Sequence, residues 1–265
     1  MGESVPVAIV GMACIFPGAP DLQTFWENIL SAKNAVGPIP EERDLPGDWP
    51  GADETDRIFC THGGFIDSNP SFSPLDYGVM PKICEKVDPE QLLIIQTVDK
   101  ALKDAGIDGA TDNLKQTDVI LGRGGYLGNS MQQLHCRAEV ISNFLGILND
   151  TLPDLDGATI STIRSELRAC FAHMNADIIP FGIPNISTGR IANRFNMMGA
   201  NYSIDAACAS ALIAVENAVV SLRRGACDKA ITGGVYLANN PSMWWTYSRL
   251  GAVSHLNSIK SFSED

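Results

Sequence analysis

Basic residues are scarce in this chain. Its 265 residues include 19 lysines and arginines against 31 aspartates and glutamates, and the formal net charge at pH 7 is −12. Nucleic acids and anionic membranes are bound through basic surfaces. The charge balance therefore argues against both as partners, and an acidic partner protein would need a local basic patch.

Paired cysteines and long apolar runs are also missing. The seven cysteines are scattered without a CxxC pair, so the sequence indicates neither a metal site nor a redox dithiol. Unpaired cysteines are typical of a reducing compartment, and we expect a cytoplasmic protein. No run of about 18 apolar residues occurs. The first ten residues lack a basic segment followed by an apolar one, so we expect neither a membrane span nor a signal peptide.

Short apolar runs alternate with segments of helical periodicity, and hydrophobic residues make up 45% of the chain. Strands are predicted over Val7–Met12, Val119–Gly122, Asn201–Ile204 and Lys229–Gly234. Helices are predicted after the cap residue Asp21, from Asp88 to Gly106, and over residues 126–148, 160–174 and 208–224, with a surface loop over 37–56. This alternation predicts an α/β layered fold with a mainly parallel sheet.

One segment combines a strand, a turn of very small residues and a helix, and it carries Cys208. A cysteine at a helix start faces unpaired N–H groups and the positive end of the helix dipole, which favour a thiolate. The small neighbours Ala206, Ala207 and Ala209 leave room for an acyl group to approach. The pattern therefore predicts a nucleophile, in the manner of a hydrolase nucleophile elbow. The alternative is a buried structural cysteine, since free cysteine is among the most buried residue types.

The same segment resembles the active-site motif of the β-ketoacyl synthases over Asp205–Leu212. Further sequence motifs of that family occur in the same order along the whole chain: Val7–Ala19 with Phe25 and Trp26, Gly63–Ile66, Asp88–Leu93, Gly189–Arg194, Gly233–Val235 and Ser248–Ser254. The resemblance is to the ketosynthase domain of a type I or iterative polyketide or polyunsaturated fatty acid synthase. The iterative subclass is favoured by Asp76-Tyr77-Gly78 with Pro81, Asn201-Tyr202-Ser203 and Ala206-Ala207-Cys208.

The resemblance implies a thiolase-like fold, an αβαβα sandwich made of two similar halves. Residues 1–265 correspond to the N-terminal half, which bears the cysteine. Two catalytic histidines, a lysine and a Gly-rich oxyanion turn belong to the C-terminal half, which we expect to be absent from this chain. Ser263 departs from the aspartate usual at the junction. None of the four histidines, His62, His135, His173 and His255, has a catalytic motif around it, and we expect all four to be structural or surface residues.

The implied activity is acyl transfer from the phosphopantetheine arm of an acyl carrier protein onto Cys208. Decarboxylative Claisen condensation with a malonyl thioester would follow, and this chain would bind no cofactor of its own. By the same resemblance, Gly125, Met243 and Tyr247 border the acyl chain, and Ile178 reaches the pocket of the second protomer in a homodimer. Ordinary core packing is the alternative for these residues.

Other functions stay open at this stage. The chain could be a non-catalytic dimer partner that shapes the pocket, or an acyltransferase without condensation activity. The cysteine favours an enzyme over the non-catalytic partner. Arg223 and Arg224, at the end of the predicted Cys208 helix, match the helix dipole, with carrier docking as the alternative. Asp205 is interpreted as a turn former.

Overall fold

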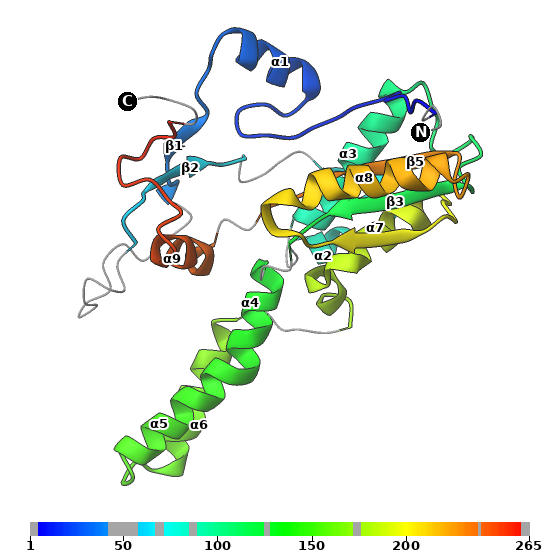
Figure 1. Cartoon of the computed structure of the whole chain (residues 1–265). Helices are drawn as coiled ribbons and strands as arrows, with labels where there is room; N and C mark the ends of the chain where they lie inside the picture. The colour runs from blue at the N-terminus through cyan, green and yellow to red at the C-terminus, as the bar shows by residue number, and fades with distance from the viewer. Residues whose placement is uncertain are drawn as a thin grey trace.

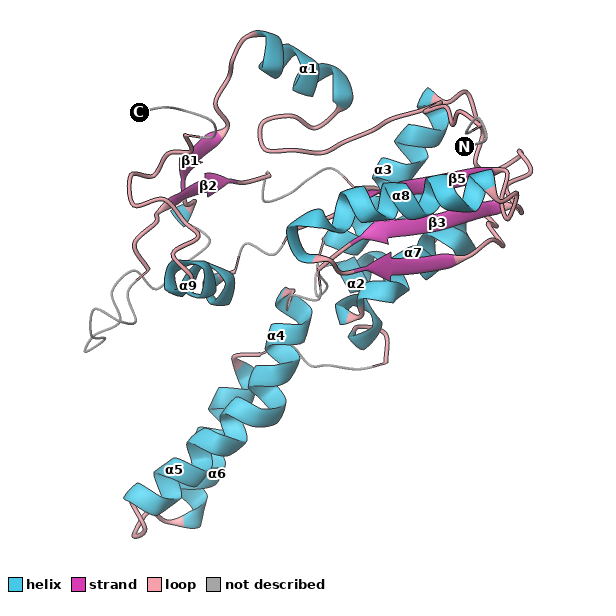
Figure 2. Cartoon of the chain, viewed as in Figure 1, coloured by secondary structure: helices cyan, strands magenta, loops and turns pink. Residues whose placement is uncertain are grey.

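The computed structural model describes residues 5–41, 58–66, 72–84, 89–124, 128–171, 176–237 and 240–260. Figure 1 shows a central sheet with helices, a helical arm that extends away from it, and a smaller group of elements beside it. The alternation of strands and helices predicted from the sequence is confirmed in this central sheet (Figure 2).

The sheet has the order β4-β3-β5, and both pairs of strands run parallel. Its strands are β3 (Thr117–Gly122), β4 (Asn201–Ile204) and β5 (Lys229–Gly234). All six residues of β3 are buried, as expected for a strand covered on both faces. The predicted strands over 119–122, 201–204 and 229–234 are therefore confirmed, and the first of them begins two residues earlier than expected.

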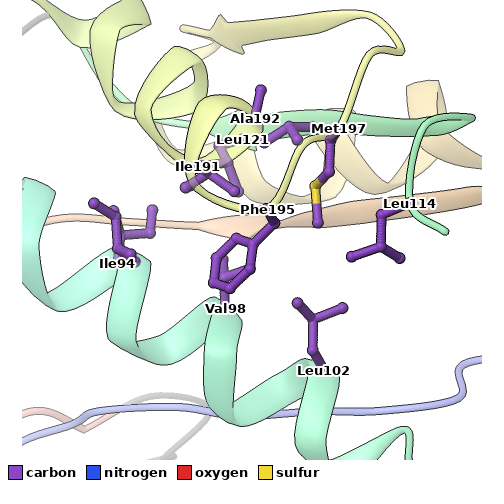
Figure 3. Packing of buried hydrophobic residues seen from close by; sticks show 11 residues of the cluster. Ile94, Val98, Leu102, Leu114, Leu121, Ile191, Ala192, Phe195 and Met197 are labelled. Carbon is purple, nitrogen blue, oxygen red and sulfur yellow. The ribbon is translucent and has the colours of Figure 1, made fainter. Parts of the chain in front are cut away.

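Helices cover both faces of this sheet. On one face lie α3 (Glu90–Asp104) and α7 (Pro184–Arg194), and on the other lies α8 (Ser210–Arg223). The larger core lies between the sheet and the first pair of helices. Figure 3 shows its members Ile94, Val98, Leu102, Leu114, Leu121, Ile191, Ala192, Phe195 and Met197. On the opposite face Ile120 packs against Ala214 and Ala218 of α8.

A helical arm stands out from the carboxyl edge of the sheet (Figure 1). It consists of α4 (Asn129–His135), a π-helical turn η4 (Cys136–Val140), α5 (Ile141–Thr151) and α6 (Gly157–Ala169). The carboxylate of Asp156 caps α6 by accepting from the N–H groups of Ala158 and Thr159, both at 2.9 Å. The 3-10 turn η5 (Ile179–Gly182) then leads back to α7.

Other short elements complete the described chain. These are α1 (Leu22–Leu30), β1 (Val36–Pro38), β2 (His62–Gly64), η3 (Pro74–Tyr77), α2 (Pro81–Cys84) and α9 (Pro241–Arg249). The predicted cap of the first helix is confirmed, because the Asp21 carboxylate accepts from the Thr24 N–H at 2.8 Å. The first residues of the predicted loop over 37–56 belong instead to β1, which pairs antiparallel with β2, and most of the loop lies outside the described residues.

The prediction of a buried strand over Val7–Met12 is wrong. These residues form no strand, and Ile9 and Val10 are exposed. The segment instead follows α3: Gly11 lies against the backbone of Ala101, and the Met12 N–H donates to Asp104 Oδ2 at 2.8 Å. Backbone groups that bond to a helix side chain in this way are not available to a sheet ladder.

Two helix predictions also need correction. The helix predicted over 126–148 begins at Asn129 in the described chain, and the second predicted helix of the arm spans 157–169 rather than 160–174. On α8, the helix that follows Cys208, the side chains that pack against Ile120 of the sheet are small. Leu212 is 76% exposed, while the small residues Ala214 and Ala218 are buried. The close approach of the sheet leaves room only for small side chains.

None of the described helices is both long and apolar enough to cross a membrane.

Candidate active site

Cys208 lies in the turn that joins β4 to α8. The chain leaves β4 at Ile204 and passes through the 3-10 turn η6 (Ala207–Ala209) before α8 begins at Ser210. Cys208 is exposed, in contrast to Cys60 and Cys227. The interpretation of Cys208 as a buried structural cysteine is therefore not supported. The predicted helix start needs a small correction, because Cys208 precedes the first α-helical residue and lies in the 3-10 turn.

The backbone immediately before the nucleophile candidate is strained. Ala207 has a φ of +49°, a left-handed conformation that residues with a Cβ rarely adopt. The Asp205 carboxylate accepts from the Ala207 N–H at 3.0 Å, which confirms Asp205 as a turn former. Strain of this kind persists where surrounding contacts hold it, and it is frequent at catalytic turns.

The Ser210 hydroxyl is the second support of this turn. It accepts from the Ala206 N–H at 2.9 Å and donates to the Ala207 carbonyl at 2.6 Å, and the side chain is buried. Sequence reasoning did not single out Ser210. The signal was available, since a serine at the start of a helix commonly bonds to nearby backbone groups.

Two glycines seat the start of α8 on the sheet. A Cβ at Gly122, the last residue of β3, would collide with the backbone of Ser210 and Ala211. A Cβ at Gly234, the last residue of β5, would lie 2.7 Å from the Ala211 Cβ. The absence of both side chains lets the helix start approach the carboxyl edge of the sheet. Cys208 is thereby held over the ends of the parallel strands, where α/β sheets bind ligands.

A buried ion pair supports the same edge from the other face. The Arg123 guanidinium pairs with the Glu90 carboxylate at the start of α3. The Arg123 backbone N–H donates to the Ile204 carbonyl at 2.9 Å, which ties the end of β3 to the end of β4. The next residue on α3, Gln91, donates to the Phe181 carbonyl at 2.8 Å and so ties α3 to η5. No local pattern indicates these contacts, because the partners are far apart in the chain.

The other predicted site residues lie on different elements from the nucleophile turn, where the structure describes them. Gly125 lies outside the described residues. Ile178 is buried immediately before η5. Met243 is buried and Tyr247 is half-buried on α9, which stands beside β1 and β2 and apart from α8 (Figure 1). Their roles beside an acyl chain therefore stay predictions.

The histidines of the described chain have contacts away from the nucleophile turn. His62 Nδ1 lies 3.2 Å from the Thr61 hydroxyl, His135 pairs with Glu139 at 3.4 Å, and the His255 ring stacks on Phe59. His173 lies outside the described residues. Within the described ranges no three His, Cys, Asp or Glu side chains are grouped so that they could hold a metal ion.

A profile described as "Beta-ketoacyl synthase, N-terminal domain" matches residues 4–265. The chain belongs to this family. Among curated relatives, a polyunsaturated fatty acid synthase protein from Thraustochytrium sp. is 30% identical over 260 residues. That match covers 97% of this chain and 9% of the relative. The 6-methylsalicylic acid synthase of Penicillium expansum is 32% identical over 263 residues, which cover 98% of this chain and 13% of the relative.

Solved ketosynthase structures support the same assignment. The oxazolomycin ketosynthase domain OzmH KS7 of Streptomyces albus JA3453 matches with a TM-score of 0.71 and 26% identity over 97% of this chain. The ketosynthase from module 6 of the bacillaene synthase of Bacillus subtilis 168 gives a TM-score of 0.65 and 26% identity over 94%. The chain spans 38% and 35% of these structures. The thiolase-like fold predicted from the sequence is confirmed.

Proposed function

We propose that this ketosynthase segment accepts an acyl chain on Cys208 for decarboxylative Claisen condensation in polyketide or fatty acid biosynthesis. The observation that carries the proposal is the exposed Cys208 on a strained turn, directly after the left-handed Ala207. Family membership supports it, because the matching profile is that of a β-ketoacyl synthase.

The first step is a thioester exchange. The Cys208 sulfur attacks the carbonyl carbon of an acyl thioester carried on the phosphopantetheine thiol of an acyl carrier protein. The new C–S bond forms as the bond to the carrier thiol breaks, and that thiol leaves as the thiolate. The start of α8 carries N–H groups that are not used within the helix, and these favour the negative charge that develops on the carbonyl oxygen.

The second step joins two carbons. A malonyl thioester loses carbon dioxide, and the resulting carbanion attacks the acyl carbon on Cys208. The C–C bond forms as the C–S bond breaks, which releases the Cys208 thiolate for another cycle. By resemblance, the acid–base groups for this step belong to the C-terminal half of a ketosynthase, so residues 1–265 supply the acyl acceptor and not the whole reaction.

The outer face of α8 supports this division into halves. Leu212 is 76% exposed and Val215 is 40% exposed, on the side of the helix opposite the sheet. An apolar face of this kind normally lies against another layer of a domain. We propose that residues 1–265 form the cysteine-bearing half and that a second, similar half covers α8.

The proposed partners are an acyl carrier protein and a second copy of the ketosynthase, in a cytoplasmic synthase. The strand before the nucleophile, β4, lies at one edge of the sheet, and its outer side has no strand partner among the described residues. We propose that it pairs with its copy across a two-fold axis. Light scattering of the complete ketosynthase domain tests this, and a stable monomer at micromolar concentration contradicts it.

The function is tested by acylation and by carbon dioxide release. The protein is incubated with a hexanoyl thioester of N-acetylcysteamine, and the acyl adduct is located by peptide mass spectrometry. We expect the adduct on Cys208 and its loss in Cys208→Ala. An adduct-free Cys208 would favour the non-catalytic dimer partner. In the full-length protein, malonyl-dependent release of carbon dioxide separates condensation from simple acyl transfer.

A further inference from the structure

The helical arm carries a groove between α5 and α6 that the proposed function does not use. The groove has a volume of about 430 Å³. It is lined by Arg137, Ile141, Ser142, Leu145, Gly146, Asn149, Ile160, Arg164 and Arg168. Ile141 and Leu145 are buried and Arg164 and Arg168 are exposed, so the groove has an apolar floor and a basic rim. We call it the arm groove.

The basic residues of the arm are concentrated in the arm groove. Residues 128–171 contain three arginines and no lysine, and all three arginines line the groove. The same stretch contains five acidic residues, Glu139, Asp150, Asp154, Asp156 and Glu166. None of these acidic residues lines the groove. A chain with a net charge of −12 therefore presents a basic surface at a defined place.

The three arginines have no acidic partner in the part of the chain that the structure describes. The described ion pairs involve other side chains. Arg164 and Arg168 are four residues apart on α6, where like charges repel each other. Arg137 is fixed by hydrogen bonds from its Nη1 to the carbonyls of Arg168, at 2.8 Å, and Phe171, at 3.3 Å. Arg137 is thus held in place, and the three arginines together present a positive charge without an acidic partner among the described side chains, which favours an anionic ligand.

The position of the arm limits what this ligand can be. Figure 1 shows α4 starting beside the carboxyl ends of β3 and β4, the edge that carries the nucleophile turn. Arg137 follows Asn129 by eight residues, which is roughly 12 Å along a helix. A partner protein seated on the arm groove is therefore on the same side of the sheet as Cys208. An open groove with an apolar floor and a basic rim suits an amphipathic, acidic helix.

We propose that the arm groove docks an acidic helix of the acyl carrier domain that delivers the acyl chain to Cys208. This inference rests on the proposed function for the identity of the partner. The groove then makes acylation by the carrier faster without taking part in the chemistry. The Arg223–Arg224 pair, considered from the sequence as a docking site, lies at the other end of α8 from Cys208 and is poorly placed for this role.

The experiment compares two acyl donors with one enzyme. The variant Arg164→Gln/Arg168→Gln leaves Arg137 and its hydrogen bonds in place. We expect its acylation of Cys208 by hexanoyl carrier protein, at low salt and subsaturating carrier, to be about tenfold slower than in the wild type. Acylation by hexanoyl-N-acetylcysteamine should not change. The wild-type rate with carrier should fall as the salt concentration rises to about 0.3 M, and the rate of the variant should fall much less.

Matched controls define the outcome. Arg224→Gln/Lys229→Gln removes the same charge at the opposite edge of the sheet and should behave as the wild type. Arg164→Lys/Arg168→Lys keeps the charge of the rim and should retain most of the carrier-dependent rate. An unchanged carrier-dependent rate in Arg164→Gln/Arg168→Gln, or an equal loss with both donors, overturns the docking proposal. Fluorescence anisotropy of labelled apo-carrier reads binding even if Cys208 accepts no acyl group. The two proposals can therefore fail separately, and equal carrier binding by wild type and variant overturns this one alone.

Discussion

Arg123 and Glu90 form an ion pair inside the protein, with side chains that are 4% and 10% exposed. The pair joins the residue after β3 to the first residue of α3. Because Arg123 also bonds through its backbone to Ile204, the ion pair is connected to the strand that leads into the nucleophile turn. Removal of the Glu90 carboxylate would leave the Arg123 charge buried without its ionic partner.

We expect Glu90→Gln to lower the free energy of unfolding by about 3 to 5 kcal/mol, as is typical when one partner of a buried ion pair is removed. The double variant Glu90→Leu/Arg123→Met removes both charges and should lose less than the single variant. Urea denaturation followed by circular dichroism measures both. A single variant that is as stable as the wild type would contradict the buried character of this pair.

Gly122→Ala should disable the nucleophile turn. The added Cβ collides with the backbone at Ser210 and Ala211, so the start of α8 must move away from the sheet. Misplacement of a reacting group by about 1 Å can cost about 100-fold in rate, and we expect a loss of that order in the acylation of Cys208. Gly157→Ala is the matched control, because a Cβ there meets no atom within 4 Å. Equal rates of Cys208 acylation for the two variants would show that the turn does not depend on the missing side chain at Gly122.

Cys208 should be the first of the seven thiols to be alkylated by limiting iodoacetamide. Burial raises the pKa of the Cys227 thiol and of the Cys14 thiol, which makes both slow to react. Cys170 is the internal control for exposure. It is exposed as well, but it lies at the end of α6, where its thiol donates to the Glu166 carbonyl at 3.3 Å. Peptide mass spectrometry gives the order in which the thiols are alkylated. Faster labelling of Cys170 than of Cys208 would contradict the prediction that the turn makes Cys208 more reactive.

Tyr77 should titrate well above a free tyrosine. Burial, together with the hydrogen bond that its hydroxyl donates to Asp99 at 3.0 Å, raises the pKa of Tyr77 to about 12. The folded protein therefore holds this proton more tightly than the unfolded chain, in which tyrosine ionises near pH ~10. Its contribution to stability is complete below about pH 10 and is lost as the pH rises from about 10 to about 12.

Ultraviolet absorbance titration measures this ionisation. Tyr77→Phe should remove the phenol that ionises last, and the stability of the variant should depend less on pH between about 10 and 12. A wild-type protein in which every tyrosine ionises together near pH ~10 would contradict the buried hydrogen bond to Asp99.

Local patterns predicted the parallel sheet well because its strands are short apolar runs bounded by turns. The six residues of β3 are buried throughout, and their burial is already visible in Val119, Ile120 and Leu121. The same reasoning failed for Val7–Met12, which is equally apolar but bonds to α3 instead of a strand. Apolar character predicts that a segment packs against another element, and it does not specify which element that is.

The position of Cys208 and the local support from Asp205 were predictable, and the ion pair behind the turn was not. A strand, small residues and a helix follow one another in the sequence, so the turn could be located from local signals. The ion pair between Glu90 and Arg123 depends on residues that are far apart in the chain and are brought together by the fold. The face of α8 that packs against the sheet was not predicted, because its contact with Ile120 is made by the small residues Ala214 and Ala218.

The π-helical turn Cys136–Val140 has a consequence for how the arm is built. Each residue of an α-helix advances the side chains by about 100° around the axis, and a π turn accommodates one residue more than a regular turn does. The turn therefore sets the rotational phase of α5 relative to α4. Deletion of Ala138 would convert α4, the π turn and α5 to one continuous α-helix. It would also rotate α5 by about a quarter of a revolution, so that Ile141 and Leu145 would no longer face α6. A single residue thus determines the direction in which the outer part of the arm presents its surfaces.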